Sequence, residues 1–257
     1  MVLGVLACGG DDSPRVVLGT THTLEDSGVL DVLTQAYDNE GDRSHRLSVV
    51  VAGSGEILAM AARGDVDVVL SHSPAAEAAL VEAGGAVSRQ PLMQGDFLIA
   101  GPPTDPAGAA STESAADALQ RIAAAGQPFV SRGDDSGTHH RELALWREAG
   151  VVPGWSGYME AGTGMADALR LASQRGAYIL SDIATYEVLR HDLSLIIMRE
   201  GGDDLINEYS VLITTHGGQT PAARELAAWL TGESARRLIG AFRAPNSDRP
   251  LYRLHAN

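Results

Sequence analysis

Short runs of aliphatic and β-branched residues alternate along the chain with stretches in which apolar residues recur every three or four positions. Residues 47–52 have the length and composition of a buried strand, and residues 56–63 have helical spacing that ends at Gly64. The chain closes with two helical stretches at 221–230 and 234–242. Such an alternation predicts an α/β fold with mostly parallel strands that are covered by helices on both faces.

The elements between these segments follow the same pattern. Further helices are predicted at 26–37, 74–82, 115–125, 137–148, 165–175 and 183–189. Further strands are predicted at 16–18, 66–70, 97–100, 129–130, 158–160, 177–180, 195–198 and 209–214. Segments rich in Gly, Pro and Asp at 101–106 and 201–204 are typical of crossings between lobes. We therefore predict a first lobe formed by residues 15–100 plus 205–257 and a second lobe formed by residues 101–204.

Four of the predicted strand-to-helix junctions are unusually rich in Gly, Ser and Thr. They lie at residues 19–23, 52–55, 131–138 and 161–165. The first N–H groups of a helix have no partner within the helix, and the helix dipole places partial positive charge there. Glycine lets the backbone approach a ligand, and Ser and Thr add hydroxyl donors. Two junctions fall in each predicted lobe, so a cleft between the lobes would bring all four to one anionic ligand.

The overall charge changes this picture only in part. A formal net charge of −14 argues against nucleic acid as a partner and repels anions at long range. Apart from His22, Arg132 is the only cationic side chain in the four junctions, and its planar guanidinium can donate two hydrogen bonds to an oxyanion. Distant carboxylates are screened by salt, so this local charge can prevail. We expect Asp134 and Asp135 to cap the following helix or to brace Arg132.

The N-terminal segment contains the only cysteine, so the chain forms no intrachain disulfide. The stretch Val5-Leu6-Ala7-Cys8-Gly9-Gly10 resembles a bacterial lipobox, in which the cysteine is lipidated. Only seven residues precede Cys8, which is short for a secretory signal, and the alternative is a short apolar strand that contains a cysteine. We predict that residues 1–14 are a signal remnant with a lipobox and a tether. No apolar run is long enough to span a bilayer, so membrane contact would require modification of Cys8.

Two stretches carry a family resemblance. The first junction reads Thr20-Thr21-His22-Thr23-Leu24-Glu25-Asp26-Ser27-Gly28, and the third reads Ser131-Arg132-Gly133-Asp134-Asp135-Ser136-Gly137-Thr138-His139. With shorter matches between Val16 and Thr214, they make the chain resemble the TupA-type tungstate-binding proteins of bacterial ABC transporters. The chain departs from the family pattern at His22, where the family has Thr, and at Thr23, where the family has Ser. The loop 53–55 has Ser54 where the family has Thr.

The resemblance implies a two-lobed type II periplasmic-binding fold that closes over its ligand. It implies an anion pocket lined by Thr21, Thr23, Ser54, Arg132, Ser136 and Thr138. The four junctions add as ligand-binding candidates Thr20, Gly137, Thr163 and Gly164. The implied protein is a monomeric, periplasmic or cell-surface receptor, without a cofactor or a catalytic role, that delivers tungstate or molybdate to a membrane permease. His22 leaves open a preference for another oxyanion.

Two other kinds of function remain as alternatives. A metal-ion receptor would draw on His22, His72, His139, His140, Asp134 and Asp135. However, no two of these histidines have the i, i+4 spacing that is typical of zinc sites on a helix. A hydrolase would use Ser136, His139 and Asp135, but the sequence around Ser136 lacks the Gly-x-Ser-x-Gly motif. Adjacency in sequence does not produce the geometry of a catalytic triad.

Overall fold

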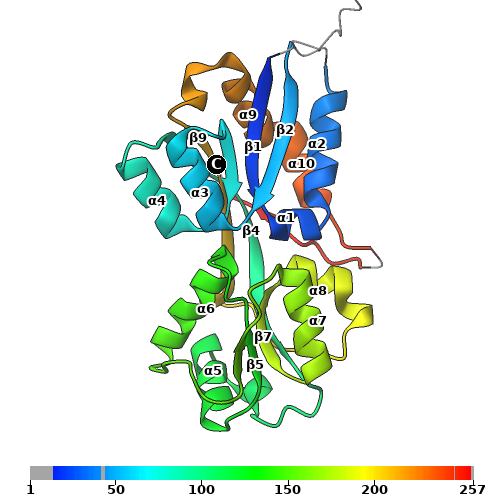
Figure 1. Cartoon of the computed structure of the whole chain (residues 1–257). Coiled ribbons are helices and arrows are strands. Elements are labelled where there is room, and N and C mark those ends of the chain that lie inside the picture. Colours follow the sequence, from blue (N-terminus) through cyan, green and yellow to red (C-terminus); the bar gives the residue numbers. More distant parts are fainter. Residues whose placement is uncertain (1–13, 42–43, 246, 256–257) are drawn as a thin grey trace, which may run out of the picture.

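The protein has an α/β fold, shown here by a computed structural model that describes residues 14–41, 44–245 and 247–255. Cys8 and the predicted leader before Pro14 lie outside these residues. Within the described part, one continuous sheet of ten strands has the order β2-β1-β3-β9-β4-β7-β5-β6, and β8 and β10 also pair with β4. Among the same residues, no helix is both long and apolar enough to cross a bilayer. Figure 1 shows the sheet running through two helix-covered parts, which we call the first and the second lobe.

The first lobe contains both ends of the described chain. Its strands are β1 (Arg15–Thr21), β2 (Arg46–Ala52), β3 (Val68–Ser71), β9 (Ile206–Thr214) and the first part of β4 (Ala86–Gly101), with β10 (Arg253–Leu254) beside it. Its helices are α1 (His22–Asp26), α2 (Val29–Asn39), α3 (Ser54–Arg63), α4 (Pro74–Glu82), α9 (Pro221–Thr231) and α10 (Glu233–Ala241). Strands β2 and β3 pair in parallel with β1, as predicted.

The second lobe is formed by the middle of the chain. Its strands are β5 (Phe129–Ser131), β6 (Tyr158–Glu160), β7 (Tyr178–Asp182), β8 (Ile196–Glu200) and the end of β4. Its helices are α5 (Ala115–Ala124), α6 (Gly137–Glu148), α7 (Met165–Arg175) and α8 (Ile183–Leu189). Strands β6 and β7 pair in parallel with β5, so the carboxyl ends of these strands lie at one edge of the sheet.

Strand β4 joins the two lobes, and it differs from its prediction. The sequence predicts a strand only at the apolar residues 97–100, but β4 already begins at Ala86. Its first part pairs with β9 and its last part with β7 and β8, all in the antiparallel direction. Residues 86–96, at the start of β4, are largely polar and contain Pro91, and both features argue against a strand. The structure accommodates Pro91 because the register shifts between Pro91 and Met93.

The predicted helix at 26–37 is wrong at its start, because the structure contains two helices there. Helices α1 and α2 are separated by Ser27 and Gly28, and Gly28 has φ +81°, a conformation that glycine adopts easily. The Ser27 hydroxyl donates to the carbonyl oxygen of Leu24 (3.0 Å) and accepts from the N–H of Val29 (3.3 Å). This turn separates the short α1, next to β1, from α2, which covers the sheet (Figure 1).

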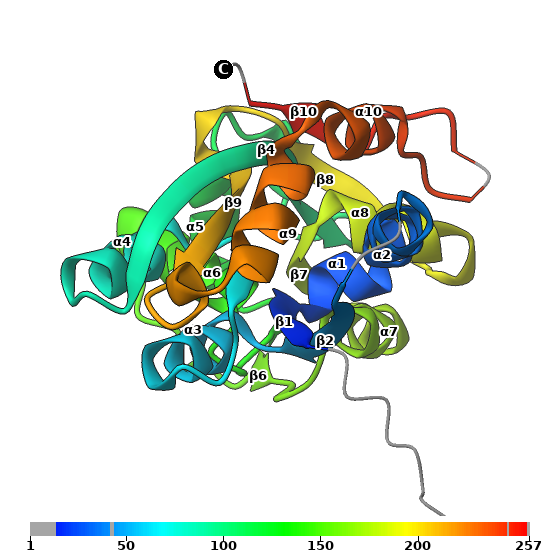
Figure 2. The ribbon, with the colours of Figure 1, turned by 90° about the horizontal axis from the view of Figure 1, so that it is seen from above.

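Each lobe has a hydrophobic core on both faces of its sheet. In the first lobe, α2, α9 and α10 cover one face and α3 and α4 cover the other (Figure 2). In the second lobe, α5 and α6 cover one face and α7 and α8 the other. The cores consist largely of aliphatic residues, and Trp146 is the largest fully buried side chain. Packing on both faces fixes the strand ends, and therefore the loops that follow them.

Candidate functional site

The four Gly-, Ser- and Thr-rich loops meet between the lobes. Each follows the carboxyl end of a strand and opens a helix: β1 to α1, β2 to α3, β5 to α6 and β6 to α7. Together they line an open cavity of about 540 Å³, whose lining consists of His22, Gly53, Gly55, Glu56, Asp134, Asp135, Gly162, Thr163 and Gly164. The structure thus brings the four predicted loops together at a cleft.

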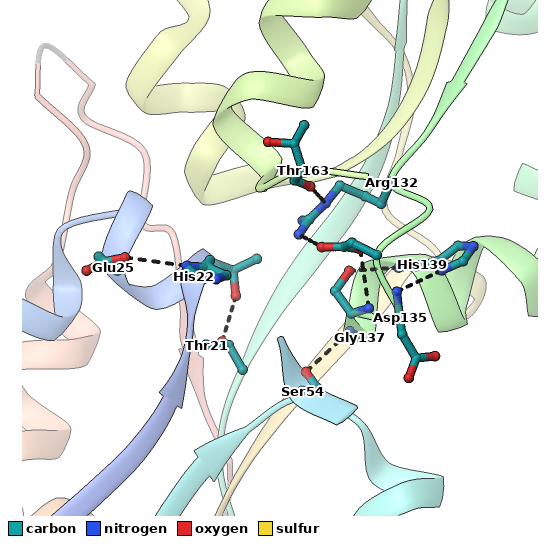
Figure 3. A network of polar contacts seen from close by, with 12 residues as sticks. Thr21, His22, Glu25, Ser54, Arg132, Asp135, Gly137, His139 and Thr163 are labelled. Carbon is teal, nitrogen blue, oxygen red and sulfur yellow. Dashed lines mark hydrogen bonds and ion pairs between the residues drawn. The ribbon is translucent and has the colours of Figure 1, made fainter. Parts of the chain in front are cut away.

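Arg132 is buried behind this cavity, with 1 % of its surface exposed. Its Nε donates to the carbonyl oxygen of Thr163 (2.9 Å), and its Nη2 forms an ion pair with Asp134. Its Nη1 is buried and has no hydrogen-bond partner among the described residues. Figure 3 shows the guanidinium projecting from its loop toward the segment that carries His22. Arg132 therefore combines a fixed orientation with donor capacity that the protein does not use.

Asp134 has the bracing role that was predicted for it. Besides its ion pair with Arg132, its Oδ1 accepts from the N–H of Ser136 (3.3 Å). Asp135 has a different role: its carboxylate contacts His140 Nε2 (2.7 Å), and its side chain is 81 % exposed. Because the carboxylate of Asp135 contacts His140 and not His139, the structure does not assemble the Ser136, His139 and Asp135 triad. His139 Nδ1 instead accepts from the N–H of Asp135 (3.1 Å).

The hydroxyl groups of the first loop are buried and already paired. Thr20 Oγ1 donates to the carbonyl oxygen of Leu70 (3.0 Å). Thr21 Oγ1 and Thr23 Oγ1 are hydrogen-bonded to each other (2.9 Å), and Thr23 Oγ1 lies 3.3 Å from His72 Nε2. The proton of the Thr20 hydroxyl is thus held by the fold, whereas Thr21 and Thr23 share one hydrogen bond in which either hydroxyl can be the donor.

His72 anchors this pair from behind. Its Nδ1 contacts Asn207 Oδ1 (2.9 Å), and its ring stacks on Tyr209 with 5.0 Å between the ring centroids. Burial lowers the pKa of His72 to about 4, so the ring is neutral at physiological pH. A neutral ring whose Nδ1–H faces the amide oxygen presents Nε2 as an acceptor, which fixes the donor direction of the Thr23 hydroxyl.

The second and third loops touch across the cleft. Ser54 Oγ, at the start of α3, accepts a hydrogen bond from the N–H of Gly137, at the start of α6 (3.2 Å; Figure 3). A Cβ atom at Gly137 would lie 2.8 Å from His72 Cε1, and one at Gly55 would lie 2.7 Å from an oxygen of Asp135. Glycine at both positions therefore permits the close approach of the lobes.

The remaining predicted residues of α6 and α7 have distinct positions. Ser136 caps α6, because its Oγ accepts from the N–H of His139 (3.3 Å). Thr138 Oγ1 is buried and has no partner among the described residues. Thr163 and Gly164 line the cavity just before α7. His22 also lines it, with 40 % of its side chain exposed and its Nδ1 3.5 Å from Glu25 Oε2. The ligand contacts assigned to these residues stay predictions.

Two carboxyl groups next to the site, the half-buried Asp26 and the buried Asp182, were not recognised in the sequence. For Asp26, in α1, burial raises the pKa, and the nearby backbone N–H of Ala166 in α7 partly offsets this effect. Asp182 ends β7 beside Arg132, and burial raises its pKa to about 6. An acidic residue directly before the predicted helix at 183–189 is a helix-cap signal, and it could have drawn attention to Asp182. Sequence alone does not show that both carboxylates interact electrostatically with Arg132.

The metal-receptor alternative finds no support in the described residues, among which no group of three or more His, Cys, Asp and Glu side chains is arranged to hold a metal ion. His139 and His140 point in different directions, as expected for neighbours on a helix, and His72 is committed to Thr23 and Asn207. The donor set around Arg132 consists of hydroxyl, N–H and guanidinium groups, which suits an oxyanion.

The chain is similar to known binding proteins in sequence and in fold. The family model of the PBP superfamily domain matches residues 11–234, a range that includes all four loops. The tungstate-binding protein TupA of Peptoclostridium acidaminophilum is 34 % identical over 269 residues, covering 98 % of this chain and 93 % of that protein. The crystal structure of the tungstate ABC transporter from Geobacter sulfurreducens is 36 % identical, with a TM-score of 0.78, and covers 89 % of this chain and 98 % of that chain. TupA from Desulfovibrio alaskensis G20 is 32 % identical, with a TM-score of 0.76, over 95 % and 100 % of the two chains.

Proposed function

The chain belongs to the family of TupA-type tungstate-binding proteins within the PBP superfamily, and on this premise we propose that it captures tungstate for an ABC importer. The observation that carries the proposal is the buried Nη1 of Arg132, for which the described part of the chain provides no hydrogen-bond partner. A buried cationic donor without an acceptor is costly, and an oxyanion in the cleft supplies that acceptor. Molybdate, which has the same shape and charge, is the nearest competitor.

The proposed binding mode uses donors from both lobes. Arg132 supplies the charge and Thr138 a hydroxyl donor from the second lobe, while Thr21, Thr23 and Ser54 face them from the first lobe. Thr163 and Gly164 contribute backbone groups before α7. These donors are fixed by helices and by hydrogen bonds such as that between Arg132 and Thr163. A fixed cage cannot contract around a smaller ion, so sulfate and phosphate should bind more weakly than tungstate.

The proposed role is binding without a chemical step. The relatives are binding proteins of transporters, and the partner implied for this chain is a membrane permease that receives the anion. We propose a monomer that works on the outer side of the membrane, held there by a lipid on Cys8. We also propose that the lobes divide within β4 just before residue 97, where its pairing passes from β9 to β7 and β8, and near residue 205, so that the chain between these points moves against the rest during capture.

Isothermal titration of the desalted protein with tungstate, molybdate, sulfate and phosphate tests the function. We expect one tungstate per chain, molybdate close to it in affinity, and little heat from sulfate or phosphate. If none of the four anions binds, the proposed function is wrong. In Arg132→Met, the loss of the buried charge should weaken tungstate at least about 100-fold.

Two further variants separate charge loss from misfolding. Arg132→Lys keeps the charge but not the planar fork, so its affinity should fall between those of the wild type and Arg132→Met. Arg147→Met is the control. Arg147 is an exposed arginine on α6 of the second lobe, and its Nε donates to the carbonyl oxygen of Leu143, so this variant should leave affinity unchanged. Equal losses in the Arg132 and Arg147 variants would mean that total charge, and not the site, determines binding.

A further inference from the structure

Asp182 is a buried carboxyl group near Arg132 whose environment disfavours a permanent negative charge. It lies at the carboxyl end of β7, which is the neighbour of β5 and therefore of the loop that carries Arg132. It is 1 % exposed. Its Oδ1 caps α8 by accepting from the N–H (2.8 Å) and the hydroxyl (3.1 Å) of Thr185. Its Oδ2 is buried and has no partner among the described residues.

The groups that face Asp182 come from four other segments. Arg132, after β5, is the favourable charge, and Asp26 of α1 is the unfavourable one. The hydroxyl groups of Tyr209 on β9 and Tyr252 near β10 are neutral, and the Asp182 charge contributes to the raised pKa of both. Ionised Asp182 therefore depends on Arg132, which Asp134 already neutralises through an ion pair.

We propose that capture of the oxyanion is coupled to the uptake of one proton by Oδ2 of Asp182. This inference rests on the proposed function, and it makes Asp182 a positioning residue that acts through Arg132. A bound dianion takes up the donor capacity of Arg132 Nη1 and adds two negative charges near Asp182. Both changes disfavour the carboxylate, so a proton moves from solvent to Oδ2, while Oδ1 keeps its bonds to Thr185.

The sign of the resulting pH dependence follows from linkage. Binding that takes up a proton becomes stronger as pH falls, because the protonated form is the one that binds. For one proton, affinity changes by at most about tenfold per pH unit, and only between the pKa of Asp182 in the free protein, about 6, and its higher value in the complex. In this range tungstate itself remains a dianion, so the dependence reports on the protein.

Calorimetry in two buffers measures how many protons the protein takes up when tungstate binds. Tungstate is titrated at about pH 7 in Tris, which absorbs much heat when it is deprotonated, and in PIPES, which absorbs little. The difference in binding heat between the buffers gives the number of protons taken up, and we expect about one. Equal heats in both buffers, with tight tungstate binding, would overturn the proton coupling and leave the proposed function intact. Failure to bind tungstate in either buffer would overturn the function itself.

The variant Asp182→Asn identifies the group that takes up the proton. Its amide oxygen can still accept from Thr185, and its NH₂ group resembles the protonated acid, so the variant should fold and bind. We expect its proton uptake to fall toward zero and its affinity to be nearly constant between about pH 6.5 and 8.5. At the upper end it should bind more tightly than the wild type, which a merely structural role would not produce.

Three matched variants test the competing proton acceptors. His22→Thr removes the imidazole that lines the cavity, Asp26→Asn removes a half-buried carboxylate near Asp182, and Glu142→Gln removes another buried acid. We expect all three to retain the proton uptake of the wild type. Loss of the uptake in one of them, with full uptake retained in Asp182→Asn, would overturn the assignment to Asp182.

Discussion

Thr138 and Thr20 present the same hydroxyl group at buried positions, but the fold uses only one of them. Thr20 Oγ1 donates to Leu70, whereas Thr138 Oγ1 has no partner among the described residues. We expect Thr138→Val to weaken tungstate binding about tenfold, the value of one lost hydrogen bond, with little change in stability. Thr20→Val should do the opposite and lower the free energy of unfolding by about 1 kcal/mol at nearly constant affinity. Titration and chemical unfolding of both variants check this, and a larger affinity loss in Thr20→Val would contradict it.

Glu142 lies beneath the loop that carries Arg132, and its environment makes stability depend on pH. Its Oε1 accepts from Trp146 Nε1 and from the Tyr158 hydroxyl, both at 3.0 Å, but burial dominates and raises its pKa to about 7. The folded protein therefore binds a proton more tightly here than the unfolded chain does, so this contribution makes stability fall as pH rises from about 4.5 to about 7.

Glu142→Gln should remove that contribution. The amide oxygen can still accept from Trp146 and Tyr158, and no charge is buried at high pH. At pH 8 we expect the variant to be more stable than the wild type by at most about 3 kcal/mol. Between pH 5 and pH 8, its free energy of unfolding should fall less than that of the wild type. Thermal unfolding across that range is the measurement. A decline that is as steep in the variant as in the wild type would be evidence against a titrating Glu142.

Sequence reasoning singled out Arg132 and Asp134 as candidates but not Asp182, and the reason is physical. A guanidinium among Gly, Ser and Thr residues indicates anion binding from local composition alone. The importance of Asp182 depends on which charges lie near it in space, and these come from α1, from the loop after β5 and from the C-terminal segment. Local sequence carries no information about such a combination.

Helix α6 approaches the first lobe more closely than a side chain at its first residue would allow. A Cβ atom at Gly137 would lie 2.8 Å and 2.9 Å from two ring atoms of His72 and 3.0 Å from its carbonyl oxygen. We expect Gly137→Ala to keep the lobes apart and to weaken tungstate binding tenfold or more. With saturating tungstate, its radius of gyration from small-angle X-ray scattering should exceed that of the wild type.

Gly240 provides the control for this variant. It lies in α10, away from the cleft, and an added Cβ would meet only Leu254 at an ordinary distance of 3.6 Å. Gly240→Ala should leave both affinity and the radius of gyration unchanged, because alanine also suits a helix interior. A Gly137→Ala protein that binds and compacts like Gly240→Ala would show that contact at this point is unnecessary for capture.

Helix boundaries were predictable where the chain contains strong local signals. The bounds of α4, α6, α7 and α8 agree with the sequence, since Pro74 begins α4 and Gly150 and Gly176, both with positive φ, follow α6 and α7. The start of β4 was not predictable, because residues 86–96 are a strand only through their pairing with β9. Long-range pairing, in contrast to a helix stop, leaves little trace in local composition.

The formal net charge of −14 opposes the approach of any anion to the protein. Affinity depends on the buried donors, but the rate of association depends on the field at longer range. We expect this rate to rise a few-fold as sodium chloride increases from about 20 mM to about 200 mM, because salt screens the repulsion. Stopped-flow measurement of intrinsic fluorescence can follow it. A rate that falls with salt would mean that a positive local field, and not the net charge, guides the anion.

The order in which the strands appear along the chain has a consequence for biosynthesis. Strand β9 lies between β3 and β4 in the sheet, but it is made more than a hundred residues after them. The residues of the second lobe are nearly contiguous, so this lobe can complete most of its pairing while the rest of the chain is still emerging. Until β9 arrives, β3 and β4 have unpaired edges, which can pair with other chains. Truncation before residue 206 should therefore yield aggregates even though both β3 and β4 are present.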